Sequence, residues 1–178
     1  MRRWNYERDQ EVPEEKRRRR TGGRTLAVRP QFPLDEIYIT LFSERRVYAP
    51  DGTIHYEPIP QRAADTGVEL LDDLRRMLSE GKSNLKTFGE GYGLTPSDVN
   101  GLVLALTGME AITFRIAWQM RRADELLRYT DLSIEEVARQ SGVGSTTNLF
   151  YACHRDFHCS PSQRRRHLRQ ANDLGRYR

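Results

Sequence analysis

The sequence predicts a mainly α-helical protein in which two helix-turn-helix units are joined by a long helix. Three observations support this fold class. Two short helical patterns are each broken by glycine and followed at once by a second helical pattern, the two breaks lie forty-nine residues apart, and an unbroken helical pattern separates them. We expect this helical part to occupy residues 68–178, after a small β-hairpin unit over residues 36–67 and a flexible charged arm over residues 1–35.

The arm contains little that a core could bury. The stretch EEKRRRRTGGR mixes charges with a glycine pair, and Pro30 and Pro33 follow it closely. Segments of this composition stay unstructured because they bury too little apolar surface to offset chain entropy. A solvated tail is the simpler interpretation of Arg17–Arg20, and an arm that touches phosphate is the functional one.

The β unit is predicted from alternation and from one turn. In the stretch EIYITLF, Ile37, Ile39 and Leu41 would lie on one side of an extended chain. Pro50-Asp51-Gly52 between two β-prone runs is a hairpin-turn signal. We expect two or three strands, and because an isolated hairpin is marginal in water, it should pack on the helical part or on a second copy of the chain.

Caps and glycines set the helix limits in the remainder. Thr95 and Pro96 suit a helix start and Gly108 suits its end. The longest helix is expected over Glu110–Arg128, with an apolar stripe of Ile112, Ile116, Met120, Ala123 and Leu127.

The second unit carries the clearest local signals. Ser133–Glu136 and Ser160–Gln163 are capping boxes, in which a serine and a glutamate or glutamine each satisfy an unpaired backbone N–H. Gly142 ends the first short helix, and the next begins near Ser145 with small polar residues. The second helix of such a unit can lie in a DNA major groove.

The unit occurs twice, since Leu85, Phe88, Gly93 and Leu94 have counterparts in Ile134, Val137, Gly142 and Val143. At 1.5 Å per residue, the connecting helix of roughly 19 residues spans about 28 Å. One DNA turn measures about 34 Å, so both second helices can meet one face of the duplex.

Composition supports a polyanionic partner. The net charge is +4, and from Arg155 onward seven arginines stand against Asp156 and Asp173. The N-terminus lacks the apolar stretch of a signal peptide, and the longest apolar run, Leu102–Leu106, is too short to cross a bilayer. With only two cysteines we expect a cytoplasmic protein that contacts no membrane.

The stretches RRADELLRYTDLSIEEVARQSGVGS and SPSQRR resemble the central signature and the closing Ser-Pro-x-x-x-Arg of the AraC-type bacterial transcription regulators. The resemblance covers residues 68–167. It implies two helix-turn-helix units, about seven helices and adjacent major grooves of a promoter as the target. Many members carry a β-barrel effector domain in front, and about 67 residues are too few for that barrel, so we expect no small-molecule sensor of that kind.

The sequence also departs from this family. Leu149 and Cys153 replace usual phenylalanines, and His158 replaces a glycine. The first recognition helix often carries an arginine where this chain has Gly101, and the corresponding residue of the second is Tyr151.

Base readout must therefore come from other side chains, because arginine to guanine is the commonest specific contact. We expect Ser97 and Asn100 to read bases in the first unit, and Thr146, Thr147, Asn148 and Tyr151 in the second. The second unit should dominate, since the first recognition helix carries Asp98 and no cation. Phosphate contacts are expected from Arg155, Arg164, Arg165 and Arg166.

One cluster allows a different interpretation. Cys153, His154, His158 and Cys159 could ligate zinc if the helix continued through them. The alternative, which we prefer, is that Cys153 fills a core position and the helix ends before His158. We expect no metal, no cofactor and no catalytic activity, because no histidine stands in a recognisable catalytic spacing.

These features favour a sequence-specific double-stranded DNA-binding regulator of transcription. The alternative is an adaptor module that keeps the fold, binds a partner protein and holds DNA only weakly. RNA polymerase or another protein is a possible partner in either case, and the β unit could mediate a homodimer.

Overall fold

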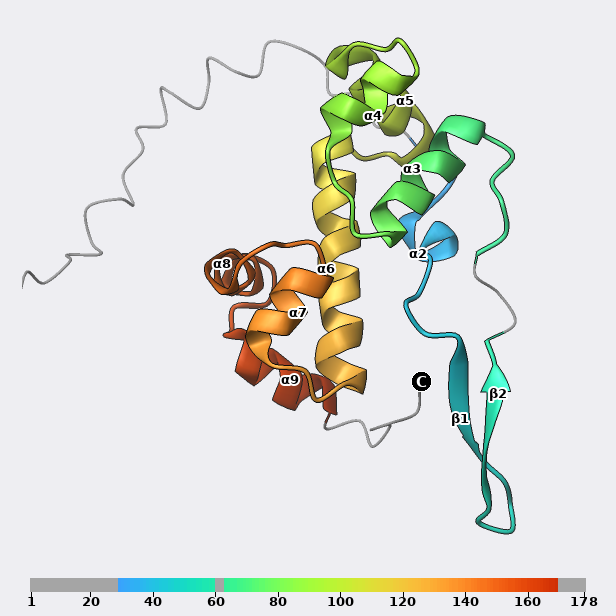
Figure 1. The fold of residues 1–178 in the computed structure, drawn as a ribbon, viewed down its shortest axis with the longest axis vertical. Helices are drawn as coiled ribbons and strands as arrows, with labels where there is room; N and C mark the ends of the chain where they lie inside the picture. Colours follow the sequence, from blue (N-terminus) through green and yellow to red (C-terminus); the bar gives the residue numbers. More distant parts are fainter. Residues whose placement is uncertain (1–28, 60–62, 170–178) are drawn as a thin grey trace, which may run out of the picture.

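The computed structural model describes residues 29–59 and 63–169, so the predicted arm and the end of the basic tail lie mostly outside the described residues. In chain order the elements are α2 (Leu34–Ile37), β1 (Glu44–Tyr48), β2 (Ile54–Pro58), α3 (Glu69–Ser79), α4 (Leu85–Gly91), α5 (Pro96–Thr107), α6 (Ala111–Tyr129), α7 (Ile134–Gln140), α8 (Thr146–Phe157) and α9 (Pro161–Arg169). Figure 1 shows them arranged around α6. The mainly α-helical fold with two helix-turn-helix units, α4–α5 and α7–α8, is thereby confirmed.

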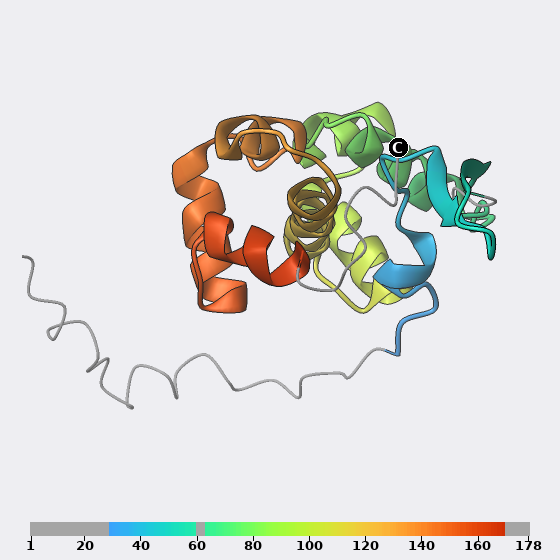
Figure 2. The ribbon, with the colours of Figure 1, turned by 90° about the horizontal axis from the view of Figure 1, so that it is seen from below.

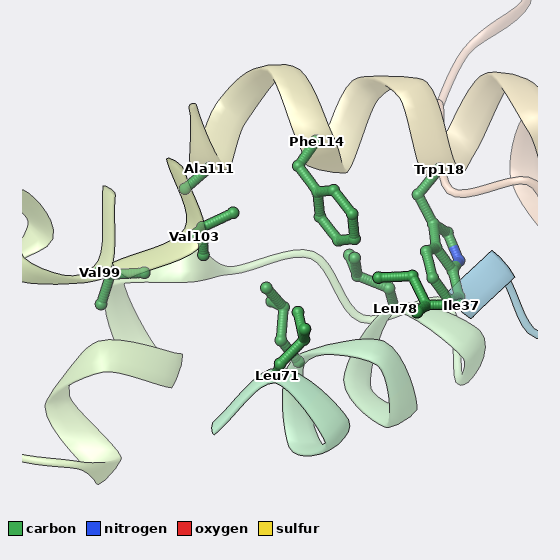
Figure 3. Close-up of a cluster of buried hydrophobic side chains, with 9 residues drawn as sticks. Ile37, Leu71, Leu78, Val99, Val103, Ala111, Phe114 and Trp118 are labelled. Carbon is green, nitrogen blue, oxygen red and sulfur yellow. The ribbon is translucent and has the colours of Figure 1, made fainter. Parts of the chain in front are cut away.

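Helix α6 supplies side chains to two separate hydrophobic cores. In the first, Phe114 and Trp118 point from α6 toward Leu71, Leu78 and Ile37 (Figure 3). The second core lies against α7 and α8, and α6 lines it with Met120, Ala123, Leu126 and Leu127. Each helix-turn-helix unit therefore has its own core, and α6 fixes one relative to the other.

The apolar stripe predicted for the long helix is only partly right. Ile112 is 58% exposed, whereas Phe114 and Trp118, which lie off the stripe, are fully buried. The reason is geometric: the two cores meet α6 on different faces, so one periodic stripe cannot describe its buried surface.

The strand predicted from the alternation of Ile37, Ile39 and Leu41 is wrong. The chain forms the short helix α2 and then has no regular structure until β1. Ile37 is 3% exposed in the first core, and its carbonyl oxygen accepts a hydrogen bond from Arg75 Nε at 2.8 Å. These apolar residues pack on helices, so their alternation does not report a sheet.

The hairpin itself forms at the predicted turn. Asp51 accepts hydrogen bonds from the backbone N and the hydroxyl of Thr53, at 2.9 and 2.7 Å, and the pKa of its carboxyl is lowered by these bonds. Strands β1 and β2 pair antiparallel, with Arg46 opposite Tyr56. Figures 1 and 2 show the hairpin at the edge of the molecule, on the other side of α6 from α7–α9. Within the described ranges, β1 and β2 make extensive contacts only with each other.

Across the described part of the chain, no single helix is long and apolar enough to cross a membrane. The pair α5 and α6 meets that test only when taken together, and it is bent by 60°.

Candidate nucleic-acid interface

The turn between α7 and α8 is built by glycines and a serine cap. Gly142 and Gly144 have φ of 82° and 97°, a left-handed conformation that costs glycine least. The N–H of Gly144 donates to the carbonyl of Ala138 at 2.9 Å, and Ser145 Oγ accepts from the N–H of Asn148 at 3.1 Å. The chain therefore reverses sharply and starts α8 as the sequence predicts.

The two units are near copies, with one difference. Helices α4 and α7 both have seven residues and lie 49 apart, whereas α5 and α8 both have twelve residues and lie 50 apart. The second turn thus contains one residue more than the first. With this offset Gly101 corresponds to Tyr151, as expected from the sequence.

Helix α8 presents the expected base-reading residues on its surface. Thr146, Thr147 and Asn148 are exposed at its start, and Tyr151 is 67% exposed one turn later. Its other face is formed by Leu149 and Cys153, both fully buried in the second core. Asn148 Nδ2 donates to the carbonyl of Val143 at 3.3 Å, a contact with the turn that orients the amide.

Two further exposed side chains on α8 were missed from the sequence. Phe150 is 44% exposed, and its ring centroid lies 4.4 Å from that of His154. Their spacing of four residues places them on one helical face, which is a signal that the sequence did contain. Together with Tyr151, whose ring is 6.1 Å from that of Phe150, they give α8 an aromatic surface.

The first recognition helix, α5, has a different surface. Thr95 and Asp98 form a capping box, and the hydrogen bonds from Thr95 lower the pKa of the Asp98 carboxyl. Ser97 is exposed at the start of the helix. Gly101 is exposed and Leu102 is 41% exposed. The surface of α5 beyond its cap is thus uncharged.

Asn100 is engaged inside the protein. Its Oδ1 accepts a hydrogen bond from the N–H of Ala111 at 2.9 Å. Glu110, the N-cap residue of α6, makes no side-chain cap bond, so Asn100 takes over that role from the neighbouring helix. The residue expected to read bases in the first unit therefore helps to start α6.

The four arginines expected at phosphate have different surroundings. Arg155 is exposed and pairs with its neighbour Asp156, with Nε 2.6 Å from Oδ1. Arg164 makes two hydrogen bonds to Asp124 of α6, at 3.0 and 2.5 Å. Arg165 donates to the carbonyl of Leu132, and burial lowers its pKa. Arg166 is exposed, and among the described residues it is the member of this set that makes no hydrogen bond or ion pair.

Arg164 and Arg165 thus help to dock α9. The guanidinium of Arg164 also lies over the ring of Phe157, 3.7 Å from its centroid. Farther along, Arg169 Nη2 lies 2.9 Å from Asp131 Oδ1. Helix α9 is therefore held by arginines against α6, α8 and the loop that follows α6.

The cysteines and histidines do not form one cluster. Cys153 is fully buried, and burial raises the pKa of its thiol to about 11. Helix α8 ends at Phe157, and His158 follows with φ 54°, so the predictions of a core Cys153 and of a helix end before His158 are confirmed. Among the described residues no group of three or more His, Cys, Asp or Glu side chains is placed to hold a metal ion.

Two helix-turn-helix units on one connecting helix define a DNA-binding class of fold, and comparisons with known proteins agree. Residues 88–167 match a family model described as a helix-turn-helix domain. A search of curated proteins gave no match.

The solved structures that resemble the chain include two DNA-binding or regulator domains. The C-terminal domain of AraT, a response regulator from Geobacillus stearothermophilus, is 22% identical, with a TM-score of 0.52 over 58% of this chain and 88% of that one. The DNA-binding domain of AdpA, a global transcriptional factor solved in complex with a target DNA, is 22% identical, with a TM-score of 0.53 over 57% of this chain and 94% of that one. At this identity the likeness establishes the fold. Over residues 88–167 the chain therefore matches a helix-turn-helix family model, and its fold resembles that of AraC-type DNA-binding domains.

Proposed function

We propose that the chain is a sequence-specific regulator of transcription that binds double-stranded DNA in the cytoplasm, with the second helix-turn-helix unit as the main reader. The observation that carries this proposal is the division of α8 into two faces. Thr146, Thr147, Asn148 and Tyr151 face outward, while the opposite face is fixed in the second core. A rigid helix with short polar side chains at its N-terminal end suits insertion into a major groove.

The exposed side chains of α8 match base edges without arginine. Asn148 can pair with adenine through two hydrogen bonds, and the methyl groups of Thr146 and Thr147 can contact the methyl group of thymine. Phe150 can make the same apolar contact. This chemistry favours A·T-containing half-sites over G·C-rich ones.

Phosphate contacts would come from two arginines in particular. Arg166 is exposed on α9, and Arg155 is exposed near the end of α8 and would exchange Asp156 for a phosphate oxygen. Arg164 and Arg165 remain candidates, but their contacts with Asp124 and Leu132 suggest that they also position α9.

The first unit contributes less in this proposal. Ser97 is the exposed candidate reader, and Asn100 is already bonded to Ala111. Asp98 would face phosphate with no cation in α5 to offset it. The protein then acts without a cofactor or a catalytic step, and a second copy could meet it through the β unit.

The test is a gel shift with genomic fragments at physiological salt, followed by anisotropy titration of a retained fragment. We expect selective retention, and Asn148→Ala should abolish the selectivity while Lys86→Ala, an exposed change on α4, leaves it intact. Uniform weak binding of all fragments by the parent protein would contradict sequence-specific readout.

A second function is supported by the surface of the first unit. A groove of about 410 Å³ lies between the starts of α5 and α6 and is lined by residues that include Leu85, Pro96 and Ile112. With Leu102 and Ile112 exposed nearby, this unit offers a partly apolar surface, with Lys86 and Glu110 also lining the groove. Such a surface favours the adaptor, which would bind RNA polymerase or another protein and hold DNA weakly. Uniform DNA binding together with specific capture by purified polymerase would support it.

A further inference from the structure

We propose that Phe150, in a stripe of side chains along the outer face of α8, reads the 5-methyl group of a pyrimidine in the major groove. The contact distinguishes thymine from uracil, and 5-methylcytosine from cytosine. It rests on the proposed function, in which α8 enters the groove, and it names the chemical group that α8 recognises there. The stripe consists of Thr147, Phe150, Tyr151 and His154.

The stripe lies on one side of α8. Its four residues stand at positions i, i+3, i+4 and i+7, the spacing that places side chains along one face of a helix. All four are exposed, whereas Leu149 and Cys153 on the opposite face are fully buried in the second core. The stripe is therefore the outermost part of α8 and would lie deepest in a groove.

The fold does not require aromatic residues at these positions. With the offset of fifty residues between α5 and α8, Val99 and Val103 correspond to Leu149 and Cys153, and all four are buried. The counterparts of the stripe contain no ring: they are Ser97, Asn100, Gly101 and Leu104. Because the first unit forms the same helix-turn-helix without rings there, the rings of α8 serve its outer surface.

Phe150 is held in place by its neighbours on the stripe. Its ring centroid lies 4.4 Å from that of His154, with 45° between the planes, and 6.1 Å from that of Tyr151, with 79° between the planes. Tilted and edge-to-face arrangements of this kind are those that aromatic pairs prefer. Phe150 is nevertheless 44% exposed. A ring positioned in this way loses little rotational freedom on contact with a ligand, so the contact costs little entropy.

An apolar ring recognises the methyl group on the pyrimidine edge and not the polar groups beside it. In the major groove thymine presents an acceptor oxygen and the methyl group at C5, whereas cytosine presents an amino donor. The side chain of Phe150 has no polar atom that could tell the oxygen from the amino group. Thymine and 5-methylcytosine carry their methyl groups at the same ring carbon. The contact with Phe150 therefore forms with either methylated base and is lost with uracil or cytosine.

The charge around the stripe favours DNA over a protein partner. Residues 146–169 contain five arginines and one acidic residue, Asp156, although three of these arginines also hold α9. Arg155 follows the stripe directly and is exposed. An apolar surface next to cations suits a ligand whose methyl groups lie between two rows of phosphates, and the major groove has this arrangement.

The test compares duplexes that differ by methyl groups alone. The probe is a genomic fragment that the parent chain retains in the gel shift, with its thymines replaced by deoxyuridine one at a time, and affinity is measured by anisotropy. At the contacted position the loss of the methyl group should weaken binding about fourfold, which is the effect of burying one CH₂-sized group. With a C·G pair at that position, methylation of the cytosine at C5 should strengthen binding by a similar factor.

Protein variants assign the effect to the stripe. Phe150→Ala should bind the thymine and uracil duplexes equally, and Phe150→Leu, which keeps an apolar side chain, should retain part of the difference. Ile54→Ala removes another exposed apolar side chain, on β2, and should leave the full difference in place. Melting followed by circular dichroism should be nearly the same in all three variants, because Phe150 and Ile54 belong to neither core.

Equal affinity for thymine and uracil at every position of a retained fragment would overturn the methyl contact and leave the proposed function intact. It is also the result expected if the stripe binds a protein partner instead. A preference for thymine that survives Phe150→Ala would overturn the contact as well, because another side chain would then read the methyl group.

If no fragment is retained, sequence-specific readout fails, and a synthetic duplex tests the methyl contact by itself. The parent chain is then titrated with a duplex of alternating dA and dT and with the same duplex carrying dU in place of dT. Tighter binding of the thymine duplex that is lost in Phe150→Ala supports the contact, and equal affinity of the parent chain for both duplexes refutes it.

Discussion

Asn100 lies in α5 and Asn148 lies at the start of α8, and the structure predicts opposite consequences for their replacement by alanine. Asn100→Ala should lower stability and leave DNA affinity nearly unchanged. Asn148→Ala should lower DNA affinity and leave stability nearly unchanged. The pair therefore tests both the internal role of Asn100 and the dominance of α8.

The stability effect follows from one hydrogen bond. Asn100 Oδ1 accepts from the N–H of Ala111 at 2.9 Å, and Ala111 is 4% exposed. Removing a side chain that caps a helix start costs typically about 1 kcal/mol, within roughly 0.5–2 kcal/mol. For a domain of this size each kcal/mol lowers the melting temperature by roughly 2–8 °C. Asn100→Asp keeps an acceptor oxygen at the same place and should retain most of the stability.

The affinity effect follows from exposure. The side chain of Asn148 is exposed, and its bond to Val143 is long, at 3.3 Å. A lost pair of hydrogen bonds to a base costs about 1–3 kcal/mol, which is roughly a 5- to 150-fold loss of affinity. Thermal unfolding by circular dichroism and anisotropy titration with the target duplex measure the two quantities. If Asn100→Ala weakens DNA binding more than Asn148→Ala at a temperature where both are folded, the first unit reads DNA and the asymmetry is wrong.

Three other predictions address the scaffold. Gly89→Ala should destabilise the first unit by about 1–3 kcal/mol in chemical denaturation, because its Cβ would lie 2.9 Å from Val99 Cγ2; an unchanged midpoint would show that α4 can shift at little cost. Arg166→Ala should shallow the log–log salt dependence of DNA binding by about 0.9 without changing the melting temperature, whereas Arg165→Ala should lower the melting temperature; the opposite outcome would exchange their roles. Burial raises the pKa of Glu125, so the folded state holds its proton to higher pH than the unfolded chain, and stability should fall as pH rises through that window. Glu125→Gln should remove this part of the pH dependence in unfolding titrations, and an identical pH profile would show that Glu125 does not couple to folding.

The helix limits could be predicted because their signals are local. Ser133, Ser145 and Thr95 each cap a helix within three residues of themselves, and Gly142 has the left-handed conformation that its position in the turn indicates. Such signals depend on the backbone of the same few residues, so they do not depend on how the rest of the chain packs.

The sequence-based predictions fail where a residue far away in the sequence determines the conformation or the contacts. Ile37 alternates with Ile39 as in a strand, but it is held by Arg75, thirty-eight residues away. Similarly, the sequence predicts that Arg164 contacts phosphate, but in the structure it bonds to Asp124, which lies forty residues away on α6. Neither pairing has a local signature, because it depends on how α2 and α9 pack.

Helix α6 determines how the two recognition helices can act. Arg122 Nη1 donates to the carbonyls of Leu78 and Ser79 at the end of α3, which ties the first unit to α6. On the second unit, Gln119 Nε2 donates to the carbonyl of Gly142 at 2.7 Å, in the turn that leads to α8.

The two donors, Gln119 and Arg122, lie three residues apart in the middle of α6, and each bonds to a different unit. The two units should therefore move together as one body. A rigid pair can place both helices in DNA only where the duplex presents its grooves at the matching distance, or where bending supplies the match. Helix α5 has no cation whose phosphate contacts could offset the free-energy cost of bending the DNA. The complex with the lower energetic cost is therefore one in which α8 reads the groove. In that complex the first unit contributes through its apolar surface or makes no contact with the DNA.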